Sequence, residues 1–140
     1  KVVRDFGKEE MLANGDRELL RQVFPNLIRN AIQAMPEGGE LRIQTRKALI
    51  PVAENDEGMG ARKFIAVKIT DTGGGISAGD LAKIFNPFFT TKDKGTGLGL
   101  AISHNIIKAH QGTIEAVCKE GKSTSFKVKI PCWDEDFDEK

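Results

Sequence analysis

"KGTGLGLAIS" spans residues 94–103 and places three glycines at alternate positions directly before a run with helical periodicity. Glycine has no Cβ atom, so such a cluster occurs either in a flexible turn or where the backbone must approach a ligand closely. Gly112 stands at a position suited to end the helix. The apolar residues that recur at helical spacing form one stripe: Leu98, Ile102, Ile106 and Ala109. The stretch therefore predicts a helix over 97–110 that begins where bare backbone is required.

Length and composition limit the possible functions. A chain of 140 residues suits one domain with a single core. Its 21 basic and 20 acidic residues nearly cancel, which argues against a nucleic-acid-binding protein. The apolar runs are short, so we expect neither a membrane span nor a signal peptide. Cys118 and Cys132 show neither metal-ligand spacing nor a disulfide pattern, so we expect a buried thiol at Cys118 and a reducing, cytoplasmic setting.

Hydrophobic periodicity and turn residues predict the order of the elements. The predicted elements are strands at 1–6 and 9–13, a helix at 17–35, strands at 40–46 and 62–70, a helix at 97–110, and a hairpin at 113–120 and 123–130. Asp16 is the expected N-cap of the first helix. Residues 49–61 show no sustained pattern and predict a loop. Residues 76–97 are polar and glycine-rich and predict a mobile segment, and the acidic end, 133–140, predicts a solvated tail.

The helix predicted at 17–35 carries two different stripes. Its apolar positions form a core-facing stripe: Leu20, Val23, Leu27, Ala31 and Ala34. Uncharged amides form the other stripe: Gln22, Asn26, Asn30 and Gln33. Asn is a poor helix former, and solvated helix faces usually carry Lys and Glu, so the amide stripe indicates a role beyond helix stability. An Asn side-chain oxygen is a neutral, hard ligand that suits Mg²⁺.

Two short motifs near residue 71 match other functions, but their surroundings do not. "GGGISA" (73–78) fits the dinucleotide pattern G-x-G-x-x-A, which also needs a long helix and a second strand that ends in an acid about 20 residues on. Asp93, at that spacing, is in no predicted strand. "DTG" (71–73) is the short signature of aspartic proteases, which are all-β, and the two predicted helices argue against that fold. The phosphate-loop pattern G-x-x-x-x-G-K-[ST] does not occur in the sequence.

Four segments, in order, resemble the nucleotide-binding boxes of histidine-kinase ATP-binding domains, which belong to the GHKL superfamily with its Bergerat fold. They are "NLIRNAIQAM" (26–35), "DTGGGI" (71–76), "FNPFFTTK" (85–92) and "KGTGLGL" (94–100), which resemble the N box, first glycine box, F box and second glycine box. The resemblance covers nearly the whole chain. It implies a single α+β domain, 1–140, built as a two-layer α/β sandwich in which helices cover one face of a mixed sheet and residues 76–97 form an ATP lid.

The resemblance implies roles for individual residues. The two expected catalytic residues are Asn30, which corresponds to the Mg²⁺ ligand, and Asn26, which corresponds to a phosphate contact. Asp71 matches the acid that accepts a hydrogen bond from the adenine amino group, and Thr124 matches a hydroxyl beside the adenine. Lys92 is placed to neutralise phosphate charge. The remaining expected ATP contacts, which include the phosphate cradle of the second glycine box, are Gln33, Gly73, Gly75, Ile76, Gly95, Thr96, Gly97, Leu98, Gly99 and Leu100.

Three positions depart from the family pattern. Pro25 predicts a kink in the N-box helix, because proline lacks an N–H and its ring clashes with the preceding turn. Gln33 stands where related domains often have Lys, which predicts a weaker phosphate contact. Asn26 replaces the general-base Glu of hydrolytic members such as gyrase, and an amide cannot accept a proton from water at neutral pH. The resemblance therefore implies slow net hydrolysis and transfer of phosphate to a protein.

The resemblance also implies partners. His104 and His110 are the two histidines, neither resembles the family's phosphoacceptor motif, and we expect both to be structural. The chain is thus expected to bind ATP and Mg²⁺ and to donate the γ-phosphate to a histidine on the dimerisation domain of the same kinase, with a response regulator as the indirect partner. We expect this segment to be monomeric and to contact neither membrane nor nucleic acid.

Two alternative functions stay open at this point. One is a serine kinase of the same superfamily, whose phosphorylated product would be stable in acid. The other is a module that binds ATP to change a partner interface and transfers no phosphate. Phosphate transfer to a supplied acceptor distinguishes both from the histidine kinase.

Overall fold

The computed structural model describes residues 1–6, 15–54, 58–87, 99–119 and 122–132. The strands are β1 (Val2–Asp5), β2 (Leu41–Glu54), β3 (Gly58–Asp71), β4 (Thr113–Lys119) and β5 (Ser123–Pro131), and the helices are α1 (Arg17–Gln33), α2 (Ala78–Leu81) and α3 (Gly99–Ala109). The strands of this described part form one sheet in the order β1-β2-β3-β5-β4. β1 is parallel to β2, and the other neighbouring strands are antiparallel. The sheet is therefore mixed, as expected.

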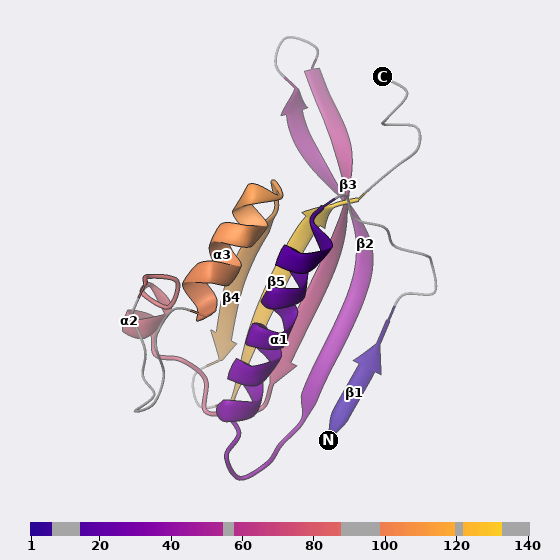
Figure 1. Cartoon of the computed structure of the whole chain (residues 1–140). Coiled ribbons are helices and arrows are strands. Elements are labelled where there is room, and N and C mark those ends of the chain that lie inside the picture. The colour runs from indigo at the N-terminus through magenta and orange to yellow at the C-terminus, as the bar shows by residue number, and fades with distance from the viewer. Residues whose placement is uncertain (7–14, 55–57, 88–98, 120–121, 133–140) are drawn as a thin grey trace.

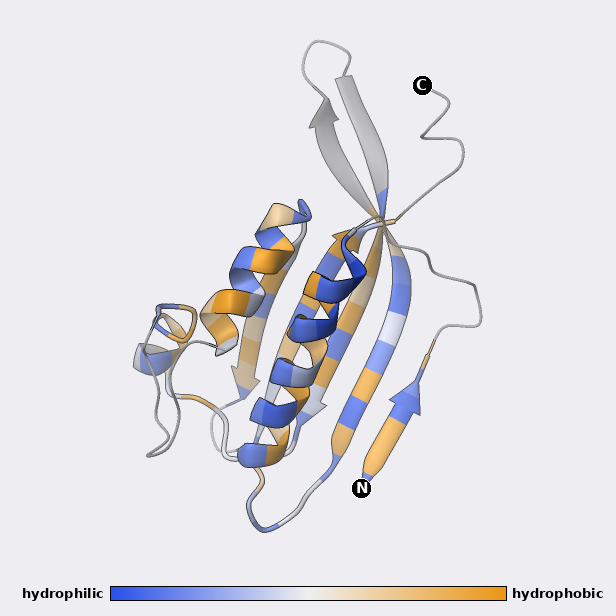
Figure 2. Cartoon of the chain, viewed as in Figure 1, coloured by the Kyte–Doolittle hydropathy of each residue, from blue (hydrophilic) through white to orange (hydrophobic). Residues whose placement is uncertain are grey.

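The helices α1 and α3 lie side by side on one face of the sheet (Figure 1). Along the part of β2 that begins at Leu41, polar and apolar residues alternate, as Figure 2 shows, and buried residues alternate along β5, so one face of the sheet packs under the helices and the other faces away from them. The core between the layers is formed by residues from both helices and all the long strands: Val23, Leu27, Ala31, Leu41, Ile69, Ile106, Ile107, Ile114, Phe126, Val128 and Ile130. The expected two-layer α/β sandwich is confirmed.

The helix α1 begins at the predicted cap. Asp16 Oδ1 accepts hydrogen bonds from the backbone N–H groups of Glu18, at 2.9 Å, and Leu19, at 3.2 Å. The helix continues through Pro25 as far as Gln33. The kink at Pro25 stays a prediction. The apolar stripe is one residue shorter than predicted, because Ala34 is the exposed C-cap of the helix rather than part of the core.

The loop predicted at 49–61 is wrong. β2 and β3 instead form a long hairpin, whose register continues from Leu41 opposite Asp71 to Glu54 opposite Gly58. The strand ladder is made by backbone N–H and C=O groups, which pair whatever the side chains are. The sequence there contains Pro51 and two glycines and does not alternate in polarity, so a search for alternation missed the strands.

The stripe predicted for the second long helix is partly wrong. The buried residues of α3 are Ala101, Ser103, Ile106 and Ile107. Ile102 is 41% exposed and Ala109 is also exposed, while Leu98 lies outside the described residues. The stripe is rotated by about one residue because the small side chains of Ala101 and Ser103 face the core. Serine is not counted in a hydrophobic pattern, so the pattern did not place Ser103 in the core.

Gly112 does follow the end of α3, but it is not the residue with left-handed backbone. Gln111 has that conformation, with φ of 62°, and the N–H of Gly112 donates to the carbonyl of Ile107 at 2.9 Å. A Cβ atom at Gly112 would clash with the backbone carbonyl oxygen of Lys129. Glycine is therefore needed here because the turn after α3 passes directly against β5.

Of the other predicted elements, some are confirmed and some fall in segments that the structure does not describe. β1 and β4 lie within the predicted strands at 1–6 and 113–120, and β5 matches the predicted strand at 123–130 but ends one residue later, at Pro131. The strand predicted at 9–13 and the tail at 133–140 fall outside the described residues. In the described part of the chain, no helix has both the length and the apolar character that a bilayer crossing needs.

Candidate nucleotide-binding site

Asp71 is a buried carboxylate at the end of β3. Only 2% of the residue is exposed, and its Oδ1 atom accepts a hydrogen bond from the backbone N–H of Gly73 at 2.9 Å. Burial raises the pKa of the Asp71 carboxyl above its ordinary value, and the Gly73 hydrogen bond offsets only part of this effect. A buried acid costs stability unless it is paired, so this position suits a group that accepts a hydrogen bond from a ligand.

Thr124 lies beside Asp71 on the covered face of the sheet. The register of β3 and β5 pairs these two residues directly, and directly opposed residues of antiparallel strands project to the same face. Thr124 is 3% exposed, and its neighbours on that face of β5 are apolar. The sheet therefore presents one buried polar pair, a carboxylate and a hydroxyl, in an otherwise hydrophobic layer.

The segment after Asp71 turns directly beneath the end of α1. A Cβ atom on Gly73 would clash with the backbone carbonyl oxygen of Ala34, so only glycine allows the two segments to come this close. Gly75 has φ of 76°, a conformation that other residues rarely adopt. The backbone therefore favours glycine at both Gly73 and Gly75 of the first glycine box.

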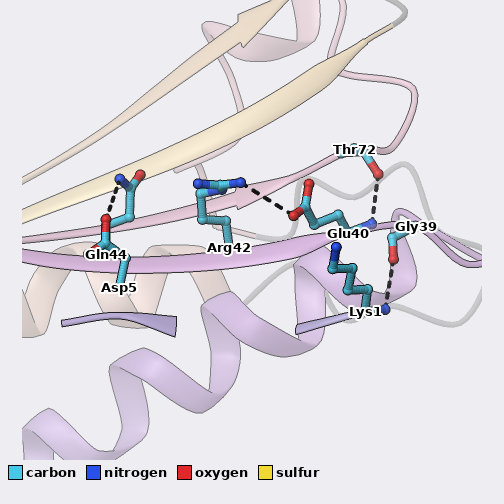
Figure 3. Close-up of polar contacts among 7 residues, drawn as sticks. All are labelled: Lys1, Asp5, Gly39, Glu40, Arg42, Gln44 and Thr72. Carbon is cyan, nitrogen blue, oxygen red and sulfur yellow. Dashed lines mark hydrogen bonds and ion pairs between the residues drawn. The ribbon is translucent and has the colours of Figure 1, made fainter. Parts of the chain in front are cut away.

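Thr72 holds this segment to the loop between α1 and β2. Its Oγ1 atom accepts a hydrogen bond from the N–H of Glu40 at 2.9 Å, and Figure 3 shows this contact beside the pair formed by Lys1 and Gly39. The Thr72 hydroxyl also points to Met35 Sδ at 3.6 Å. Sequence reasoning missed this role, and the only signal for it was the position of a threonine between the acid and the glycines.

The predicted amide stripe lies along α1, which Gly73 approaches at Ala34 and Gly99 approaches at Asn26. Asn26 and Asn30 are both partly buried, whereas Gln33 is exposed. A Cβ atom placed on Gly99, the first residue of α3, would lie 3.8 Å from Asn26 Cγ. The first residue of α3, at the positive end of the helix dipole, therefore lies next to this Asn side chain.

The contacts along α1 give the site a direction and a length. Ala34 marks the end near Asp71, Asn26 marks the end near α3, and Asn30 lies between them. From Asn26 to Ala34 the helix rises by about 12 Å, so these two contacts lie well apart along α1. A purine at the Asp71 end would thus place its phosphates near the two asparagines and the first turn of α3.

These residues fit both a magnesium ion and a phosphate chain. Amide oxygens are suitable Mg²⁺ ligands, and Mg²⁺ takes only one or two protein oxygens when phosphates and water fill its other positions. Helix N-termini bind phosphate through backbone N–H groups and the helix dipole. The side chains of Asn26 and Asn30 and the start of α3 are therefore chemically compatible with a magnesium ion and a phosphate chain.

The structure does not test every predicted contact. Lys92, Gly95, Thr96, Gly97 and Leu98 lie outside the described residues. Leu100 is partly buried and packs against the core, and Ile76 is likewise partly buried. Of the predicted lid at 76–97, residues 76–87 are described. Phe85 there packs against His104 and Phe126, with ring centroids 5.2 and 6.4 Å apart.

His110 has a defined structural role. Its Nε2 atom accepts a hydrogen bond from the backbone N–H of Asp16 at 2.9 Å, so its Nδ1 atom donates to the carbonyl of Ile106 at 2.7 Å. The imidazole thereby joins the N-terminus of α1 to the last turns of α3. Both ring nitrogens are used in this contact, and His104 contacts Phe85 through its ring.

The fold and the site define a class: nucleotide-binding α/β sandwiches in which a helix bearing asparagines lies across a mixed sheet. Residues 15–134 match the family described as histidine kinase-, DNA gyrase B- and HSP90-like ATPase. The chain belongs to this family, and its similarity to curated histidine kinases identifies it as a catalytic ATP-binding domain of the histidine-kinase type.

The curated relatives are kinases much longer than this chain. Sporulation kinase A of Bacillus subtilis (strain 168) is 40% identical over 126 residues, covering 90% of this chain and 19% of the relative. Sensor histidine kinase ZraS of Escherichia coli (strain K12) is 43% identical over 122 residues, covering 87% of this chain and 23% of the relative. The chain therefore spans about a fifth of these proteins.

Solved structures have the same fold. The nucleotide-free catalytic domain of histidine kinase ThkA has a TM-score of 0.74 and 31% identity, covering 94% of this chain and 78% of that one. Full-length ShkA in complex with AMPPNP has a TM-score of 0.72 and 23% identity, covering 94% of this chain and 25% of that one. The second likeness is to the fold alone.

Proposed function

We propose that this domain binds Mg²⁺-ATP along α1 and donates the γ-phosphate to a histidine on a separate dimerisation domain. The observation that carries the proposal is the arrangement along α1: the buried Asp71–Thr124 pair near its C-terminal end, the partly buried Asn30 in the middle, and Asn26 beside the start of α3. The helix α1 thus links a buried polar pair of the sheet at one end with two asparagines and the start of α3 at the other.

In this proposal, Asp71 recognises the adenine base. Its carboxylate accepts a hydrogen bond from the exocyclic amino group, and Thr124 supplies a hydroxyl beside it. At the other end, Asn30 would hold the Mg²⁺ ion, which neutralises phosphate charge. Asn26 and the N–H groups at the start of α3 contact the phosphates. Lys92 and the second glycine box complete the phosphate contacts in this proposal, and Gln33, exposed one residue before Ala34, is a further proposed ATP contact.

Transfer to a protein, rather than use of ATP as fuel, follows from the side chain at position 26. A general base must accept a proton from the attacking water, and the Asn26 amide has no basic atom at neutral pH. Phosphoryl transfer needs mainly positioning and charge neutralisation, which the site provides once an acceptor is docked. The acceptor histidine and, indirectly, a response regulator are the proposed partners in two-component signalling.

The test is incubation of this chain with γ-labelled ATP, Mg²⁺ and a purified dimerisation domain that contains an acceptor histidine. We expect acid-labile label on the added domain and none on this chain, because His110 uses both ring nitrogens in structural contacts. Acid-stable label would indicate a serine kinase. Binding of ATP without any transfer would favour the sensing module, and stoichiometric label on His104 or His110 would contradict their structural assignment.

A further inference from the structure

Cys118 contacts the segment that follows the buried Asp71. Its Sγ atom accepts a hydrogen bond from the backbone N–H of Ile76 at 2.8 Å, and its S–H group donates to the carbonyl of the same residue at 3.1 Å. The two residues are 42 positions apart in the sequence. One thiol therefore satisfies both polar backbone groups of Ile76, at the junction between the first glycine box and the segment that leads to α2.

The position of Cys118 in the sheet connects this contact to the nucleotide site. Cys118 pairs with Thr124 in the β4–β5 register, and Thr124 pairs with Asp71 in the β5–β3 register. The three side chains therefore form one row across neighbouring strands, on the face that the helices cover. The sulfur lies one strand beyond the hydroxyl, which in turn lies one strand beyond the carboxylate.

We infer that Cys118 is a positioning residue for the adenine end of the site: its thiol fixes Ile76, and with it the glycine-rich segment that follows Asp71. The inference rests on the proposed function, because it assumes that these two residues face the base. It assigns a role in nucleotide affinity to a residue that touches no nucleotide.

The segment from Thr72 to Ile76 needs this contact because of its composition. It contains three consecutive glycines, whose backbone has more conformations to lose than that of any other residue. At its beginning, Thr72 is held by Glu40, and Gly73 by the carboxylate of Asp71. Cys118 holds its other end. A segment fixed at both ends is preorganised, so less ordering remains to be done when a nucleotide binds.

The chemistry of the contact predicts which substitutions are tolerated. The thiol acts as donor and acceptor at once, and a hydroxyl can do the same, whereas valine fills a similar volume with neither function. The backbone ladder of β4 and β5 does not depend on this side chain, so the sheet is expected to persist in both variants. Cys132 offers a matched control, since it is also partly buried and follows the end of β5.

The test measures ADP affinity by calorimetry and amide hydrogen exchange at Ile76 in Cys118→Val, Cys118→Ser, Cys132→Ser and the parent chain. We expect Cys118→Val to bind ADP about threefold to tenfold more weakly and to exchange the Ile76 amide faster. Cys118→Ser should retain affinity within about twofold, and Cys132→Ser should match the parent in both measurements. Thermal melting verifies that each variant is folded, and Cys118→Ala replaces the valine variant if that one fails to fold.

The outcomes separate this inference from the function on which it rests. Unchanged Ile76 exchange in the valine variant would overturn the inference whatever the nucleotide result. Equal weakening by valine and serine would also overturn it, because side-chain size rather than hydrogen bonding would then be responsible. An Asp71→Asn variant that binds ADP as well as the parent would instead overturn the proposed adenine site, while the Ile76 exchange still reports on the contact itself.

Discussion

The two ends of the candidate site are formed by different secondary structure, strands at one end and a helix at the other. At the proposed adenine end, Asp71 and Thr124 belong to paired strands, are at most 3% exposed and have their positions fixed by strand register. At the proposed phosphate end, Asn26 and Asn30 lie on the side of a helix and are only partly buried. The sheet thus offers a fixed and dry surface suited to reading a base, and the helix offers polar groups near solvent suited to hydrated ions.

This difference leads to different expectations for the two ends. Changes at the adenine end should alter the affinity for every adenine nucleotide, with or without metal, because all of them share the base. Changes at the phosphate end should act on the Mg²⁺-dependent step and leave the binding of the base intact.

The largest effect is expected for Asn30→Ala. Removing the proposed Mg²⁺ ligand should lower phosphate transfer to an added dimerisation domain by about 100-fold or more, because the ion supplies much of the charge stabilisation of the transferred group. ADP affinity without Mg²⁺ should stay within about twofold of the parent. Gln22→Ala, on the same stripe but two turns earlier, is the matched control and should transfer normally. Full transfer by Asn30→Ala would remove its metal role.

An intermediate effect is expected for Gly73→Ala. The added Cβ would meet the backbone oxygen of Ala34, which cannot move without shifting the end of α1, so the free energy of unfolding should fall by about 1–3 kcal/mol. Denaturant unfolding of Gly74→Ala provides the control, because a Cβ there meets nothing within 4 Å. Equal stability of the two variants would show that the first glycine box does not pack against α1.

The smallest effect concerns the stability cost of the buried acid. Burial raises the pKa of Asp71 in the folded protein, while the unfolded chain keeps the ordinary value of 3.8. The folded state therefore binds this proton more tightly, and stability is lost as the pH rises from the unfolded pKa through the folded one. Asparagine has no charge to bury and can still accept the Gly73 hydrogen bond.

We therefore expect Asp71→Asn to melt at a higher temperature than the parent at pH 7, with the difference vanishing as the pH falls toward 3.8. Thermal melts across this range measure it, and Glu37→Gln, an exposed carboxylate change, serves as control. A lower melting temperature for Asp71→Asn at neutral pH would mean that the carboxylate is a net stabilising group.

Sequence patterns predicted most of the elements, and the family resemblance implied the layers of the fold. Amphipathic stripes identified α1, and the alternation of polarity at 40–46 identified the first part of β2, because both patterns reflect which side of an element is buried. The hairpin of β2 and β3 was missed beyond residue 48, since backbone pairing there leaves no polarity pattern. The buried stripe of α3 was misplaced because two of its members, Ala101 and Ser103, are small.

For the site, the residue types were predictable and their connections were not. The amide stripe and the acid before three glycines pointed to Asn26, Asn30 and Asp71. The contact of Cys118 with Ile76 depends on a strand register that joins positions 42 residues apart, and no local pattern encodes it. The same is true of Gly73 beneath Ala34, where the close approach is visible only in three dimensions.

The central claim is that Asp71 reads the base of a bound nucleotide, and calorimetric titration of the parent and Asp71→Asn with ATP and GTP tests it most directly. Guanine presents a carbonyl oxygen where adenine has its amino group. In the parent, this oxygen and the Asp71 carboxylate would both be hydrogen-bond acceptors, so no hydrogen bond could form between them. An unpaired buried polar group costs about 1–3 kcal/mol, which predicts at least several-fold weaker binding of GTP. In Asp71→Asn, ATP should bind more weakly and the preference should narrow. Equal affinity of the parent for ATP and GTP would contradict the account.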